Sequence, residues 1–220
     1  MSAVAIVFVL VTAGYAWAFQ PSVAGTPEFL WRFAAPHAVL TAFAVRELAK
    51  DGVLLERLKP RWGDLSMGAL TALLLLMASW AARATLAPPG SERQAWLLFI
   101  YVELGDPEQI QRSIVLSGLL VGITLAEEIV WRGLVLTRLT ERFGPRRGWL
   151  CAVALYSLAS LPTAYTLRSA AGLNPLLVLA TLGCGLVWTF LTMRVGRLVP
   201  AIFSHMAFTY FSVVQFRIPT

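Results

Sequence analysis

Two adjacent carboxylates lie inside an apolar stretch of the sequence, and their position makes them the residues best suited to chemistry. Glu127 and Glu128 fall within residues 113–136, a run whose apolar flanks are long enough to span a bilayer. A carboxylate at that depth costs about 3 kcal/mol on insertion. A chain retains such groups where they pair with a cation, take part in chemistry, or do both. Glu127 and Glu128 are therefore the leading candidates for functional residues.

Helix geometry gives the two glutamates different surroundings. Glu128 and Arg132 are four residues apart and share a helix face, so the guanidinium can neutralise the carboxylate inside the bilayer. Glu127 points about 100° away and is the more available carboxylate. A buried carboxyl group near a histidine can act as a general base toward water. The alternative is a purely structural ion-pair cluster without chemistry.

Composition places the chain among membrane proteins. Of its 220 residues, 58% are hydrophobic and only 14% are charged, which is typical of a polytopic membrane protein and not of a water-soluble globule. The net charge is +6, but the basic residues lie between the apolar runs. That pattern indicates contact with the surface of a lipid bilayer and argues against a nucleic-acid partner. We expect a single integral membrane domain over residues 1–220.

The apolar runs predict an all-α polytopic transmembrane helix bundle of about seven or eight spans. The seven predicted spans are residues 2–19, 30–45, 65–82, 113–136, 149–165, 175–193 and 198–214. Pro36 and His37 interrupt the second span, and we expect His37 to be a packed or interfacial histidine far from the acids. Residues 96–102 are apolar but too short to cross, so they are expected to lie at the interface or to re-enter.

Loop charges predict the orientation. Basic residues concentrate in three gaps, at residues 46–61, 138–147 and 194–197. With seven spans all three gaps lie on one side of the membrane. The positive-inside rule makes that side cytoplasmic and puts the N-terminus there too.

Several polar groups are expected at similar depth. At about 1.5 Å per residue, Glu127 lies roughly 14 Å from the cytoplasmic end of its span, and His205 roughly 10 Å. Tyr156 and Ser160 lie roughly 10 and 16 Å into the fifth span. Three helices would thus line a polar chamber open toward the cytoplasm.

A stripe of small residues lies on the glutamate segment. Gly118, Gly122 and Ala126 recur every four residues. Because small residues let transmembrane helices approach closely, we expect another helix to dock on this stripe and to bring its side chains near Glu127.

The glutamate segment resembles a known signature. Glu127-Glu128-x-x-x-Arg132 is similar to the EExxxR motif of the CAAX prenyl protease and bacteriocin-processing (CPBP, or Abi) intramembrane proteases. The family core would cover about residues 65–215. The family's second motif is aromatic-xxx-His, and its third is a final-helix His followed four residues later by Asn.

The second and third motifs match in part. Tyr156 stands at the aromatic position of the second motif, but Ser160 stands where the family has His. The run Pro-Ala-x-x-x-His205 is similar to the third motif, and Thr209 takes the place of Asn. Ser160 can hydrogen-bond a water but cannot accept a proton as an imidazole does, whereas the Thr209 hydroxyl could replace an amide donor.

The resemblance implies a mechanism. Glu127 would be the base that activates a water for attack on a peptide carbonyl, and His205 would stabilise the oxyanion. Glu128 and Arg132 would form the pair that completes the catalytic set. Tyr156, Ser160 and Thr209 would play supporting roles. The resemblance therefore implies an intramembrane endopeptidase that cleaves a membrane-anchored protein or peptide, and a bacterial inner (plasma) membrane is the expected location.

No metal and no cofactor is expected. A catalytic zinc site normally has about three protein ligands, and Arg132 would repel a cation near the two glutamates. The chain also lacks HExxH, so the usual zinc-binding helix is not available.

Three alternatives stay open. Because Ser160 replaces the motif-two His, the chain could be a catalytically inactive relative that binds a membrane partner without cutting it. A serine nucleophile at Ser160 with His205 as its base would need a Gly-x-Ser-Gly turn, which the sequence does not contain. A proton-coupled transporter would normally have a longer chain or an internal repeat.

Overall fold

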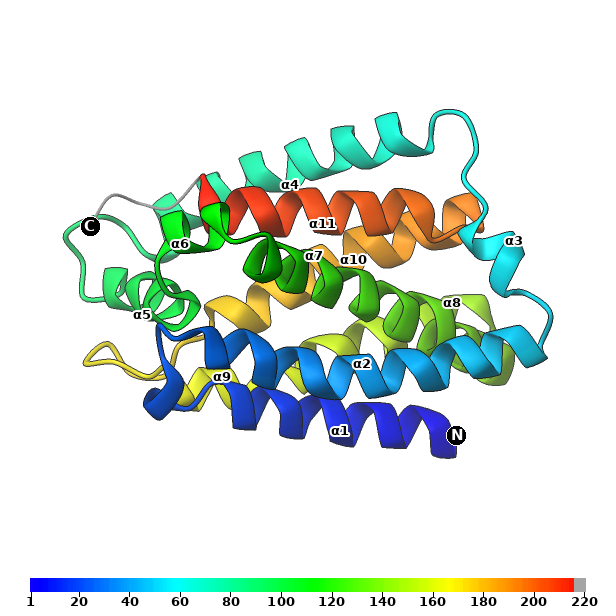
Figure 1. Ribbon diagram of the computed structural model, residues 1–220, viewed down its shortest axis with the longest axis horizontal. Helices are drawn as coiled ribbons and strands as arrows, with labels where there is room; N and C mark the ends of the chain where they lie inside the picture. Colours follow the sequence, from blue (N-terminus) through cyan, green and yellow to red (C-terminus); the bar gives the residue numbers. More distant parts are fainter. Residues whose placement is uncertain (216–220) are drawn as a thin grey trace.

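The computed structural model describes residues 1–215 as a bundle of long helices (Figure 1). The long helices are α1 (Ser2–Ala18), α2 (Pro27–Lys50), α4 (Asp64–Leu86), α7 (Ile114–Glu128), α8 (Leu136–Ala159), α10 (Leu176–Val195) and α11 (Val199–Val214). The shorter elements are η1 (Pro21–Val23), α3 (Leu54–Leu58), α5 (Gln94–Leu104), α6 (Pro107–Arg112), the π-helical η2 (Ile129–Val135) and α9 (Leu161–Thr166). Residues 1–215 contain no named β-strand, and the all-α prediction is confirmed.

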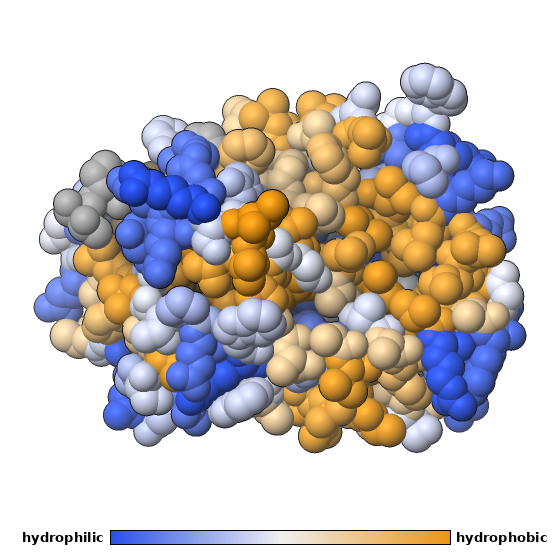
Figure 2. Space-filling model, in the orientation of Figure 1, coloured by the Kyte–Doolittle hydropathy of each residue, from blue (hydrophilic) through white to orange (hydrophobic). Residues whose placement is uncertain are grey.

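The bundle has the surface of a membrane protein. The helical segments Asp64–Leu86, Ile114–Thr166 and Leu176–Val195 are long and apolar enough to cross a bilayer, and Ser2–Ala18 and Val199–Val214 are shorter apolar helices. Figure 2 shows apolar side chains over the middle of the visible face and hydrophilic ones gathered at both ends of the long axis. The helices therefore run along the direction in which a membrane would be crossed.

The chain reverses direction within α8. Gly144 has φ 77°, a conformation that suits glycine, and Pro145 follows it. Gly148 then lies so close to Thr140 that a Cβ at Gly148 would be 2.6 Å from the backbone of Thr140. The second half of α8 thus returns along the first half and carries Tyr156 back toward the glutamates.

Helix α2 runs without a break from Pro27 to Lys50, so the predicted interruption at Pro36 and His37 is wrong. Pro36 costs α2 one backbone hydrogen bond but leaves the helix intact. Its ring packs against α1, where a Cβ on Gly14 would lie 2.9 Å from Pro36 Cγ. Glycine at position 14 therefore permits a close α1–α2 hairpin, which fixes the place of His37.

The three basic gaps meet at one end of the bundle, as the loop charges predict. Arg197 binds Asp64 at the start of α4 at 2.6 Å, and Arg138 binds Asp51 after α2 at 2.8 Å. The backbone N–H of Leu198 donates to the carbonyl of Arg57 at 2.9 Å. The N-terminus lies at the same end (Figure 1).

The predicted docking of a helix on the small-residue stripe is wrong. A Cβ added at Gly118 or Gly122 would meet no atom of the described chain within 4 Å. Helix α7 instead buries its other face, with Leu116, Leu120 and Ile123, against the core. The larger side chains decide the packing because they make more van der Waals contacts with neighbouring helices than glycine can.

Helix α5 carries a buried acid outside the spanning segments, and we expect it to make stability depend on pH. Glu103 is 5% exposed, and burial raises the pKa of its carboxyl group to about 7. The folded chain therefore holds this proton more tightly than the unfolded chain does. The resulting stabilisation is complete below the unfolded pKa of 4.5 and is lost as the pH rises through about 7.

Glu103→Gln removes this titration. We expect the unfolding temperature of detergent-solubilised wild type to fall relative to that of the variant between pH 5 and pH 8. Parallel unfolding temperatures for the two proteins across that range would contradict the assignment.

Candidate active site

The glutamate doublet lies where α7 changes its helical geometry. Glu127 and Glu128 occupy the last turn of α7, and Arg132 lies on the π-helical segment η2. Short π-helical segments within α-helices often occur at functional sites. The three residues are 5%, 0% and 1% exposed. Since isolated charges are costly at such depth, each must be compensated by neighbours.

Glu128 and Arg132 form the ion pair that their spacing predicts. Arg132 Nη1 lies 3.1 Å from Glu128 Oε1. The guanidinium also lies over the ring of Tyr156, 4.2 Å from its centroid. Gly185 of α10 makes room for this stack, since a Cβ there would be 2.9 Å from Tyr156 Cδ1. The aromatic of the second motif therefore packs the arginine and holds it toward Glu128.

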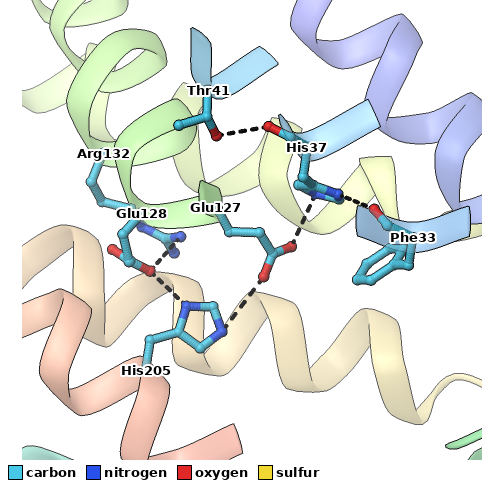
Figure 3. Close-up of polar contacts among 7 residues, drawn as sticks. All are labelled: Phe33, His37, Thr41, Glu127, Glu128, Arg132 and His205. Atoms are coloured by element: carbon cyan, nitrogen blue, oxygen red, sulfur yellow. Dashed lines mark hydrogen bonds and ion pairs between the residues drawn. The ribbon is translucent and has the colours of Figure 1, made fainter. Parts of the chain in front are cut away.

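His205 of α11 bridges the two glutamates (Figure 3). Its Nδ1 lies 2.8 Å from Glu128 Oε1, and its Nε2 lies 3.6 Å from Glu127 Oε2. The ring stacks on Trp188 at 3.7 Å between centroids, and the Trp188 indole N–H donates to Ser204 Oγ at 3.1 Å. The imidazole is thus held in one orientation by a residue, Trp188, that sequence reasoning missed.

His37 of α2 faces Glu127 from the opposite side (Figure 3). Its Nε2 lies 3.7 Å from Glu127 Oε1, and its Nδ1 lies 2.7 Å from the carbonyl oxygen of Phe33. The side chain is packed, as expected, with the Phe33 ring 4.8 Å away and no exposed surface. The expectation that it lies far from the acids is wrong, because the α1–α2 hairpin brings α2 against α7.

Tyr15 of α1 also lies beside the cluster, close enough for its side chain to interact with that of Glu127. The signal that could have singled out His37 was its place inside an apolar segment, where ionisable residues are functional by default. Tyr15 gave no such signal, because a tyrosine in an apolar helix is common in any core.

Ser160 and Thr209 do not join the cluster. The Ser160 hydroxyl is 2.7 Å from the carbonyl oxygen of Ser157 and 3.0 Å from Thr181 Oγ1, so it belongs to the contact between α8 and α10. Thr209 lies one turn beyond His205 on α11 and is half-buried. In the described part of the chain, the polar contacts that tie the glutamates to the histidines include neither hydroxyl.

The cluster does not fit a metal ion. Within residues 1–215, no group of three or more His, Cys, Asp or Glu side chains is arranged to hold one. Arg132 already supplies a fixed positive charge 3.1 Å from Glu128. This fixed positive charge would repel a second cation beside it.

Comparison with known proteins gives a family match over part of the chain. Residues 109–211 match the family of type II CAAX prenyl endopeptidases described as Rce1-like. The matched segment runs from α6 into α11 and contains both glutamates, Arg132 and His205, whereas His37 lies outside it. No curated protein and no solved structure matches the chain. Over residues 109–211, just under half of its length, the chain is therefore similar to the Rce1-like CAAX protease family of intramembrane proteases.

Proposed function

We propose that the protein is an intramembrane endopeptidase that cleaves a peptide bond in a membrane-anchored protein or peptide by glutamate-activated water. One observation carries the proposal. The Glu127 carboxylate is held in the interior between two imidazole nitrogens, 3.6 Å from His205 and 3.7 Å from His37. A carboxylate in such surroundings can accept a proton from water. Similarity to a protease family supports the same reaction class.

Charge balance supports the assignment of roles. The two glutamates carry two negative charges and Arg132 one positive charge, so one further proton makes this buried cluster neutral. With that proton on His205, Nδ1–H donates to Glu128 at 2.8 Å and Nε2–H points toward Glu127. His205 is then a donor able to stabilise an oxyanion, and Glu127 is an ionised base.

The reaction follows from these roles. The water oxygen bonds to the peptide carbonyl carbon while one water proton moves to Glu127. The carbon–nitrogen bond of the tetrahedral intermediate then breaks, and the proton on Glu127 leaves with the amine. Glu128 and Arg132 hold His205 in place throughout. Tyr156 and Trp188 keep the arginine and the imidazole fixed.

The membrane setting completes the proposal. We place the end that carries the three basic gaps, together with the N-terminus, in the cytoplasm of a bacterium, with the chain in its inner membrane. The N-terminal hairpin contributes His37 and Tyr15 to the cluster, which supports a single functional domain over residues 1–220. The apolar middle of the surface suits a substrate held by the same bilayer.

The test is cleavage of membrane-anchored peptides by the full chain in proteoliposomes, with products identified by mass spectrometry. Wild type is expected to cut. Ser160→Ala is expected to cut at a rate within about threefold of wild type, because Ser160 is hydrogen-bonded away from the cluster. A large loss of cleavage in Ser160→Ala would point to a serine nucleophile. If wild type binds a membrane-anchored peptide but never cuts it, the result would favour a catalytically inactive relative that only binds its partner.

A further inference from the structure

We propose that His37 supplies the second imidazole of the active site and holds the attacking water together with Glu127. The inference rests on the proposed function and assigns a further catalytic residue to it. His37 lies on α2, outside the family match at residues 109–211, so the match does not assign it. The N-terminal hairpin would thereby complete a site that the matched segment leaves with one imidazole.

The hydrogen bond at Nδ1 determines which nitrogen of His37 is free. Nδ1 lies 2.7 Å from the carbonyl oxygen of Phe33, which can only accept a hydrogen bond, so Nδ1 carries the hydrogen. In the neutral ring Nε2 is then a lone-pair acceptor. This acceptor points at Glu127 Oε1, which is an acceptor too when the carboxylate is ionised (Figure 3).

His37 Nε2 and Glu127 Oε1 are both hydrogen-bond acceptors, so a favourable contact between them needs a donor that bonds to both. Their separation of 3.7 Å exceeds the length of a direct hydrogen bond. Both His37 Nε2 and Glu127 Oε1 are buried and have no hydrogen-bond partner among the described residues. Buried polar atoms normally have one, from protein or from water. A water that donates one hydrogen to each atom meets both needs and keeps its lone pairs free to attack a carbonyl carbon.

The proton balance gives His37 a definite part. As the water oxygen bonds to the carbonyl carbon, one water proton moves to Glu127 Oε1 and later leaves with the amine. The other proton stays on the oxygen that becomes part of the new carboxyl group. That group ionises, and His37 Nε2 accepts this second proton and releases it to solvent. The site returns to its starting state with one water consumed.

Packing fixes His37 in this place but does not by itself explain why it is a histidine. The Phe33 ring lies tilted against the imidazole, the Thr41 hydroxyl donates to the His37 carbonyl at 2.7 Å, and Gly14 lets α1 pack against Pro36. An apolar side chain of similar size could fill the same volume. Only an imidazole leaves a basic nitrogen directed at Glu127, in a chain whose Ser160 cannot supply one.

The test compares His37 variants with a control on the same helix in the proteoliposome cleavage assay. His37→Asn keeps an N–H able to reach the Phe33 carbonyl and loses Nε2, so kcat/KM is expected to fall about 10²- to 10³-fold, mainly through kcat. His37→Ala is expected to fall as far, and added imidazole is expected to restore its rate at least about tenfold. Val39→Ala, at a position of the same helix that is 66% exposed, is expected to cut like wild type.

The outcomes separate the two claims. If wild type and His37→Asn cut equally well, the role of His37 is refuted and the proposed function stands. Both His37 variants could instead lose activity, unfold at a lower temperature than wild type and fail to recover with imidazole. That result would make His37 a structural residue and would overturn the inference. If wild type itself cuts no membrane-anchored peptide, the proposed function fails and the inference fails with it.

Discussion

Glu127→Gln is expected to lower kcat/KM for peptide cleavage by at least about 10³-fold. The amide is close to the carboxylate in shape but cannot take a proton from water, so the reaction loses its base. His37 and His205 both direct a nitrogen at this one carboxylate. Arg132 and His205 instead hold the Glu128 carboxylate through its Oε1. Initial rates in proteoliposomes at several substrate concentrations give the measurement.

An exposed acid provides the matched control. Glu108 forms an ion pair with Arg112 at 3.0 Å, and the Glu108 side chain is 70% exposed. Glu108→Gln is expected to cut like wild type. Glu127→Gln should unfold at no lower temperature than wild type, because the change removes a buried charge. A folded Glu127→Gln that keeps more than about a tenth of the wild-type rate would exclude Glu127 as the base.

Arg132→Met is expected to have the largest effect on stability, about 3–5 kcal/mol in the free energy of unfolding. The change leaves Glu128 fully buried without its cation, 3.1 Å from where the guanidinium was. It also removes the stack between the guanidinium and Tyr156. Denaturant unfolding of the detergent-solubilised chain, followed by tryptophan fluorescence, gives the measurement.

The chain offers a second ion pair with the same spacing for comparison. Arg112 and Glu108 are also four residues apart and 3.0 Å from each other, but their side chains are 82% and 70% exposed. Arg112→Met should leave stability unchanged, since exposed pairs contribute little. Glu128→Gln combined with Arg132→Met should recover much of the stability lost by Arg132→Met alone. If the single and double variants lose equal amounts of unfolding free energy, the unpaired charge of Glu128 is not the cause of the loss.

Sequence reasoning found the part of the site that lies along one helix. The i, i+4 rule predicted the Glu128–Arg132 pair, and the pair is present even though η2 is π-helical. The depth comparison placed His205 near the glutamates, and the contact at 2.8 Å between His205 and Glu128 agrees with it. These relations depend on spacing within a helix and on depth along parallel helices, which a sequence contains.

The rest of the site depends on how helices pack sideways, which spacing does not determine. His37 reaches Glu127 only because Gly14 and Pro36 draw α1 and α2 together and α2 lies against α7. Trp188 reaches His205 across the contact between α10 and α11. Ser160 stands at the position where the second motif has His, yet its hydroxyl lies 3.0 Å from Thr181 Oγ1 and not at the cluster.

Trapping of the reaction intermediate tests most directly whether water attacks the peptide bond without a covalent enzyme intermediate. Wild type is incubated with a cleaved membrane-anchored peptide in ¹⁸O-labelled water, with and without hydroxylamine, and the new C-termini are weighed by mass spectrometry. The expected product carries one ¹⁸O and forms no hydroxamate when hydroxylamine is present. A hydroxamate at the cut site would reveal an acyl-enzyme and would contradict the role given to Glu127.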